Sequence, residues 1–106
     1  MNPKFEKVCE GLDWNVTVYS EDVELQKASP AGEDFSISVS LDNLPDGVRT
    51  AAENFDVDDH VHMLLDAKRS GLSGVPDVQT LVDDAEAIQG MLDELADALE
   101  RANRNP

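Results

Sequence analysis

Residues 78–102 read VQTLVDDAEAIQGMLDELADALERA, and their apolar side chains recur at alternating steps of three and four residues. This spacing predicts a long amphipathic helix with an unbroken heptad seam along one face. The seam comprises Val78, Leu81, Ala85, Ile88, Leu92, Leu95, Leu99 and Ala102. At about 1.5 Å per residue the helix spans roughly 37 Å, which is more than the width of a small domain. The rest of the chain is therefore expected to pack against this seam or to leave it for a partner.

The side of this helix opposite the seam is predicted to be acidic. A helical wheel, with about 100° between successive residues, gathers six carboxylates there. They are Asp83, Glu86, Asp93, Glu94, Asp97 and Glu100. Carboxylates three or four residues apart on a helix lie about 5–6 Å from one another, a spacing of similar order to that of phosphates along a DNA strand. We therefore predict that this acidic face binds a basic partner; the alternative is a solvated outer face.

Two further properties of the acidic face follow from its residues. Mutual repulsion among crowded carboxylates predicts raised pKa values in the folded state. Gly90 falls in the middle of the face and costs about 1 kcal/mol relative to alanine in a helix. It weakens a continuous row of charges, or it marks a close approach by a partner.

The composition of the chain limits its partners and its location. The 106 residues carry 23 acids and 8 bases, which gives a formal net charge of −15. Such a charge disfavours direct binding to nucleic acid or anionic membranes and favours basic proteins. No apolar run approaches the roughly 20 residues that a membrane span needs, and the N-terminus lacks the pattern of a signal peptide. We expect a cytoplasmic protein with a single domain over residues 1–106.

The first half of the chain predicts one helix and three strands. Asn2 can cap a helix that ends near Gly11. Alternating apolar residues predict strands over 14–19, 23–27 and 35–41, and serine occupies every second position of the third strand. One apolar face and one polar face are typical of an antiparallel sheet, and the short connections favour a three-stranded β-meander.

The second half of the chain predicts three helices. Pro45 favours a helix start, and an apolar stripe follows it at helical spacing. That stripe comprises Leu44, Val48, Ala51, Ala52 and Phe55. Asp56 is expected to cap a further helix that ends at Gly71, and residues 72–77 connect it to the last helix. The predicted fold is α+β: an N-terminal helix, a three-stranded antiparallel meander, and three helices, with the long C-terminal helix packed on the sheet.

The residue types that usually carry chemistry are poorly arranged here. His60 and His62 diverge by about 200° on a helix, so His60 is expected to pack at the edge of the core. His62, one turn from Asp58 and Asp66, needs a third ligand to hold a metal. The lone Cys9 is expected to be buried. We therefore predict no catalytic residue, no metal and no cofactor.

Three short segments carry a resemblance to a known family. They are Ser29-Pro30-Ala31-Gly32-Glu33-Asp34-Phe35, Phe55-Asp56-Val57-Asp58-Asp59-His60, and Gly74-Val75-Pro76 with the helix beyond Asp84-Ala85-Glu86. In these segments the chain resembles a family of small acidic bacterial proteins of unknown function, often encoded among the genes of mobile elements. The resemblance covers about residues 14–99. It implies an accessory or counter-defence role and assigns no functional residue.

These observations lead to one function hypothesis and two alternatives. The hypothesis is a non-enzymatic acidic module that docks on a basic surface of an unidentified protein, in its most specific form a DNA mimic that inhibits a nucleic-acid-binding enzyme. The first alternative is a structural homodimer that self-associates through the heptad seam. Salt dependence separates these two, since carboxylate contacts weaken with ionic strength and leucine contacts do not. The second alternative is a metal-binding protein or enzyme that uses His62 with its acidic neighbours.

Overall fold

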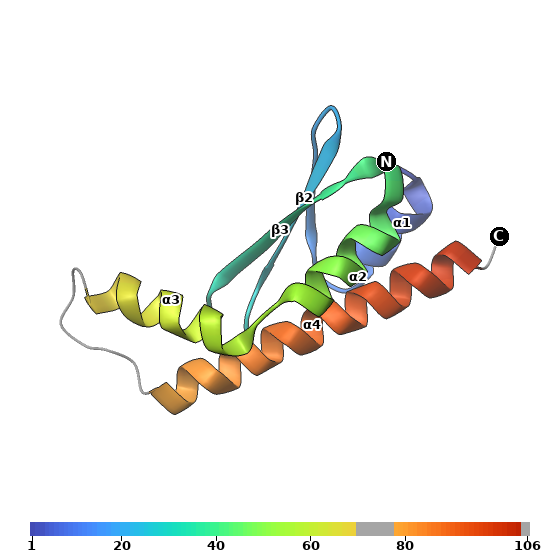
Figure 1. Ribbon diagram of the computed structural model, residues 1–106. Helices are drawn as coiled ribbons and strands as arrows, with labels where there is room; N and C mark the ends of the chain where they lie inside the picture. The colour runs from blue at the N-terminus through green and yellow to red at the C-terminus, as the bar shows by residue number, and fades with distance from the viewer. Residues whose placement is uncertain (70–77, 105–106) are drawn as a thin grey trace.

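The computed structural model describes residues 1–69 and 78–104, and its elements follow the order of an α+β fold (Figure 1). The first half consists of α1 (Pro3–Gly11), β1 (Asn15–Val18), β2 (Asp22–Ala28) and β3 (Asp34–Ser40). A short 3-10 turn, η1 (Leu41–Asn43), leads into α2 (Leu44–Asn54), α3 (Val57–Arg69) and α4 (Val78–Arg104). The predicted helix, three strands and three further helices are all present, so the predicted fold class is confirmed.

Helix α1 begins where its capping residue predicts. The Asn2 side chain accepts a hydrogen bond from the Lys4 amide at 3.0 Å, and Pro3 occupies the first helical position. The chain turns after the helix at Asp13, whose φ of 67° lies in the left-handed region. Cys9 is fully buried, and burial raises the pKa of its thiol to about 11. Cys9 is therefore a packing residue, as predicted.

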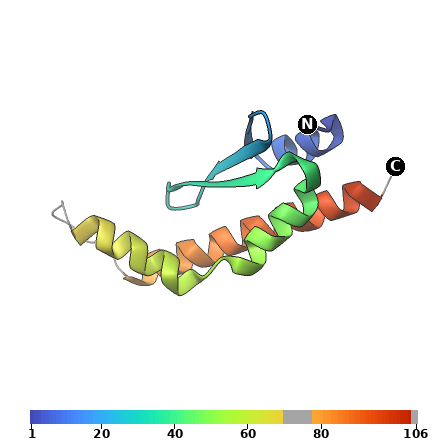
Figure 2. The same ribbon diagram turned by 45° about the horizontal axis from the view of Figure 1, so that its top comes forward.

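The three strands form an antiparallel sheet in the order β1-β2-β3. Leu25 lies opposite Val16 on one side and opposite Ile37 on the other, so the central strand sets the register of both neighbours. Val23, Leu25 and Val39 are buried on the face that the helices cover. The alternate positions of β3 are exposed serines: Ser36, Ser38 and Ser40. Figure 2 shows this sheet lying above α2 and α4.

Helices α2 and α3 join in a short extended link. Val48 and Ala52 of α2 are buried, and Phe55 follows the helix in an extended conformation. The Asp56 carboxylate accepts a hydrogen bond from the Asp59 amide at 3.1 Å, which confirms the predicted cap of α3. Phe55 packs against both apolar clusters of the molecule and so links them.

The seam of α4 is core over most of its length. Its six central members, with exposed fractions of 0–6%, are Leu81, Ala85, Ile88, Leu92, Leu95 and Leu99. Val78 is 52% exposed, so the prediction that the seam begins there is wrong. The physical reason is geometric, because α3 diverges from α4 toward this end of the molecule (Figures 1 and 2). Ala102, at the other end, is half-buried.

Two apolar clusters divide α4 between them. The larger cluster joins the sheet and α2 to the part of α4 that contains Ile88, Leu92 and Leu99. The smaller cluster lies between α3 and the start of α4, and its buried members are Val61, Leu81 and Ala85. The two ends of one helix are therefore held by different parts of the fold.

Some predictions fall on residues that the structure does not describe. The connection at 72–77, the helix end at Gly71 and the side chains of Lys68 and Arg69 lie outside the described residues. Among residues 1–69 and 78–104, no helix is both long enough and apolar enough to cross a membrane.

Candidate acidic interface

The six carboxylates predicted for the outer side of α4 do lie away from its seam. Five of them are exposed: Asp83, Glu86, Asp93, Glu94 and Asp97. The sixth, Glu100, keeps 34% of its side chain exposed, so it is half-buried and not exposed as the helical wheel predicts. The reason is a neighbouring helix, α2, which a helical wheel of one helix does not include. Whether the face binds a partner stays a prediction.

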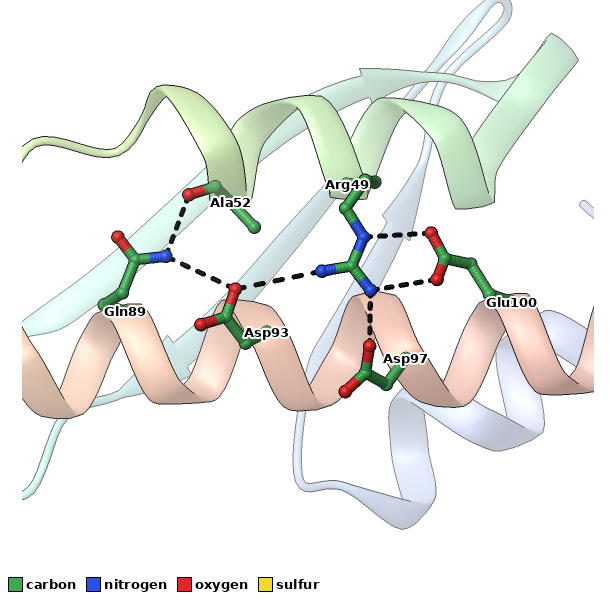
Figure 3. Close-up of polar contacts among 6 residues, drawn as sticks. All are labelled: Arg49, Ala52, Gln89, Asp93, Asp97 and Glu100. Carbon is green, nitrogen blue, oxygen red and sulfur yellow. Dashed lines mark hydrogen bonds and ion pairs between the residues drawn. The ribbon is translucent and has the colours of Figure 1, made fainter.

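Arg49 of α2 reaches across to the C-terminal half of α4 and meets three of these carboxylates (Figure 3). Its guanidinium donates two hydrogen bonds to Glu100, from Nε and from Nη2, both at 2.9 Å. Nη2 also donates to Asp97, and Nη1 lies 3.9 Å from Asp93. Gln89 extends the network, because its amide donates to Asp93 Oδ1 at 3.4 Å and to the Ala52 carbonyl of α2 at 2.8 Å. The guanidinium of Arg49 therefore contacts three carboxylates on successive turns of α4.

This contact shifts the pKa values of its members in opposite directions. Hydrogen bonds to Glu100 and Asp97 raise the pKa of Arg49 above its usual range. The hydrogen bond from Arg49 holds the pKa of Glu100 below its ordinary value of 4.5, and the charge of Arg104 acts in the same direction. The raised pKa predicted for crowded carboxylates is therefore wrong for Glu100, since a cation lies closer than the neighbouring anions.

Among the residues that the structure describes, no cation pairs with the remaining carboxylates of the face. Asp83 accepts a hydrogen bond from the neutral amide of Gln79 at 2.9 Å. Within the described part of the chain, neither Glu86 nor Glu94 forms a hydrogen bond or an ion pair. Asp83, Glu86 and Glu94 therefore form a separate set, the open carboxylates, which differs from the three carboxylates that contact Arg49.

A further acidic group on α4, which the sequence did not single out as a site residue, is buried. Asp84 is 7% exposed, and its Oδ2 accepts a 2.6 Å hydrogen bond from the hydroxyl of Ser29, itself 5% exposed. Its Oδ1 accepts from the Ala31 amide at 2.9 Å. The Ser29 oxygen in turn accepts from the Glu33 amide at 3.0 Å. Ser29 is thus a buried structural partner of Asp84, and the pair ties the β2–β3 loop to α4.

The sequence did hold a signal for this contact. On the helical wheel Asp84 falls outside the acidic face and near the seam, where an ionisable residue needs a partner. The serine-proline turn that begins at Ser29 offers such a partner, but its distance of 55 residues from Asp84 hides the contact.

The same loop is fixed to α3 through a histidine. Glu33 Oε2 lies 3.0 Å from Nε2 of His60, whose side chain is 9% exposed. The His60 ring also packs against Phe55 and Phe35, at centroid distances of 5.2 and 6.1 Å. Its predicted role as a packing residue at the edge of the core is confirmed.

His62 does not lie in a group of side chains that could ligate a metal. His62 is exposed, as are Asp58 and Asp66. Across residues 1–69 and 78–104, no three His, Cys, Asp or Glu side chains gather in a way that could hold a metal ion. The two histidines of the chain therefore lie in different surroundings, one packed and one solvated.

Comparisons with protein families, with curated proteins and with solved structures found no match to this chain. The resemblance to small acidic bacterial proteins stays a prediction.

Proposed function

We propose that this protein is a non-enzymatic interaction module that docks on a basic surface of another protein through α4. The observation that carries the proposal is the set of open carboxylates: Asp83, Glu86 and Glu94. They are exposed on a helix whose opposite side is core, and no described cation neutralises them. Unpaired surface charge of one sign attracts and orients a partner of the opposite sign.

The packing of α4 supports this role. Leu81 fixes the helix against α3, and Ile88 and Leu92 fix it in the larger cluster. Because the backbone of α4 is already ordered by this packing, docking orders only the side chains of the carboxylates and not the backbone that carries them. Asp83 and Glu86, three residues apart, keep the carboxylate spacing on which the DNA-mimic form of the proposal depends, and Glu94 lies eight residues beyond Glu86.

The Arg49 contact narrows the surface that we assign. The six predicted carboxylates do not act alike, since Asp93, Asp97 and Glu100 already meet a cation within the chain. We therefore assign the docking surface to the open carboxylates. An accessory or counter-defence role on a mobile element rests on the resemblance alone.

Self-association through the seam draws no support from the packing. The central seam residues Ile88, Leu92 and Leu95 are only 0–1% exposed within a single chain, so they present no apolar surface to a second copy. A dimer formed by these residues would require the core to open. The open carboxylates are available without any rearrangement.

The test is a charge-neutral triple variant, Asp83→Asn with Glu86→Gln and Glu94→Gln. A partner is first recovered by pull-down from the native host and identified by mass spectrometry. We expect the variant to associate more slowly with that partner and to lose most of its salt dependence, with the fold unchanged.

The matched control removes the same number of charges elsewhere, at exposed Glu10, Glu21 and Asp22. We expect it to bind much as the unmodified protein does. Equal weakening by both variants would show that only net charge matters, and weakening by neither would leave α4 a solvated face. Either result overturns the proposal.

A further inference from the structure

A hollow of about 270 Å³ lies where the β2–β3 loop meets the start of α4. It is lined by Pro30, Ala31, Thr80, Asp83, Asp84 and Ala87. The loop supplies apolar walls and α4 supplies two consecutive carboxylates, one exposed and one buried. An apolar wall beside an anion is suited to a side chain that is aliphatic along its stem and cationic at its tip.

The buried carboxylate is the unusual part of this hollow. Both oxygens of Asp84 accept hydrogen bonds, but the two donors, the Ser29 hydroxyl and the Ala31 amide, are neutral. No described lysine, arginine or histidine pairs with Asp84. A buried charge is costly without an opposite charge, and a cation entering the hollow would supply one.

We infer that this hollow receives an arginine side chain of the basic partner. The inference rests on the proposed function, since it names the side chain that the acidic surface anchors. The guanidinium is planar and weakly hydrated, so it can lie against Pro30 and Ala87 while its donors point at Asp83 and Asp84. Lysine concentrates its charge in a strongly hydrated ammonium and is less suited to an apolar wall.

The surface next to the hollow fits a partner that passes along α4. Gly90 follows Ala87 by three residues and is exposed, and a Cβ placed on it would meet no atom within 4 Å. Nothing in the described chain therefore explains a glycine there, whereas a close approach of partner backbone does. Glu94, one turn further on, offers a second anion to the same segment.

A second hollow on the molecule provides an internal comparison. It is larger, about 480 Å³, and is lined by Glu10, Asp13, Trp14, Asn15 and Val16. Both of its carboxylates are exposed, and Trp14 is buried. A guanidinium that is attracted to any acidic hollow would bind there as well.

The experiment is a titration of the ¹⁵N-labelled protein with N-acetyl-arginine amide, followed by amide chemical shifts. We expect saturable shifts at Ala31, Thr80 and Ala87, weaker ones with N-acetyl-lysine amide, and none with the neutral citrulline analogue. Shifts of equal size around Glu10 and Asp13, shifts that do not saturate, or tighter binding of the lysine probe would overturn the inference.

Two variants test whether the arginine probe needs the hollow itself or only the negative charge of α4. Ala87→Leu fills the hollow and keeps both carboxylates, and we expect it to weaken the arginine probe by about tenfold. Ala98→Leu changes a half-buried alanine of the same helix outside the hollow and should leave the probe unaffected. If Ala87→Leu disturbs the fold, Ala31→Leu, which fills the hollow from the loop and also keeps both carboxylates, should produce the same weakening with an otherwise unchanged spectrum.

The partner itself distinguishes the two proposals. Partner binding that survives Ala87→Leu but fails in the triple variant of the open carboxylates refutes the arginine hollow and leaves the proposed function standing. Partner binding that survives both variants refutes both proposals.

Discussion

The two ends of α4 carry the same kind of side chain in different surroundings. Toward the C-terminus, Asp97 and Glu100 share Arg49 of α2, and the helix packs in the larger apolar cluster. Toward the N-terminus, Asp83 and Glu86 meet no described cation, and the helix packs in the smaller cluster with α3. One end of the helix has its carboxylates partly compensated by an arginine and packs in the larger cluster, and the other end has no described cation and packs in the smaller cluster.

This difference shows what decides whether a surface carboxylate is available to a partner. Position on a helical wheel places all six carboxylates outward, but a cation from another element decides which of them remain unpaired. Both the pairing of a carboxylate with a cation and the reduced exposure of Glu100 therefore depend on the tertiary structure and not on the helix alone.

The largest effect should come from the larger cluster. Leu92→Ala is expected to lower the free energy of unfolding by about 2–5 kcal/mol, because it leaves a cavity among fully buried neighbours. Leu81→Ala, in the smaller cluster, should fall at the low end of that range. Urea denaturation measures both. An equal loss from the two variants would remove the difference in packing that we describe.

The next effect concerns Asp84, the buried carboxylate near the start of α4. Asp84→Ala should cost about 1–3 kcal/mol, because it leaves the Ser29 hydroxyl and the Ala31 amide without an acceptor. Asp83→Ala, at the exposed neighbour, is the control and should change stability by no more than about 0.5 kcal/mol. A loss that is no larger at Asp84 than at Asp83 would show that the loop is not fixed through this carboxylate.

Gly90, between the two ends, should give a gain. Gly90→Ala is expected to stabilise the protein by about 0.8–1 kcal/mol, since the site is helical and exposed and has open space for a methyl group. If a partner passes over Gly90, the same change weakens docking while it raises the midpoint of thermal unfolding. If the stabilised variant bound the partner with unchanged affinity, the partner would not pass over Gly90.

The smallest effect is the pH dependence of stability that arises from the contact between Arg49 and Glu100. The pKa of Glu100 is lowered in the folded protein, so its contact with Arg49 contributes stability above pH 4.5. That contribution is lost as the pH falls through the lowered value. Arg49→Gln should therefore be less stable than the unmodified protein at pH 7, with the difference shrinking on acidification below 4.5. If the stability difference between Arg49→Gln and the unmodified protein grew on acidification, Glu100 would not have a lowered pKa in the folded protein.

The sequence was sufficient for those features that depend on local pattern. The serine alternation over 36–40 predicts a half-exposed strand, Asn2 and Asp56 predict helix caps, and the heptad seam predicts the core side of α4. Each of these follows from the period of one element or from groups a few residues apart. The structure confirms all of them and shortens the seam only at Val78.

The features that the sequence missed all join distant residues. Arg49 lies 51 residues from Glu100, and Ser29 lies 55 from Asp84. No periodicity within one element contains such a pair, because it depends on how α2 and the β2–β3 loop cross α4. The sequence therefore predicted which carboxylates lie away from the seam, but it could not predict which of them pair with an arginine.

We expect the N-terminal end of α4 to attract the partner more strongly than the C-terminal end, where Arg49 pairs with the carboxylates. A comparison of association rates at low salt tests this with two double variants, Asp83→Asn with Glu86→Gln and Asp97→Asn with Glu100→Gln. Each removes one aspartate and one glutamate charge from the same helix, so the change in net charge is identical. We predict that the first pair slows association several-fold and that the second has little effect. Equal slowing by the two pairs, or greater slowing by the second, would contradict this assignment.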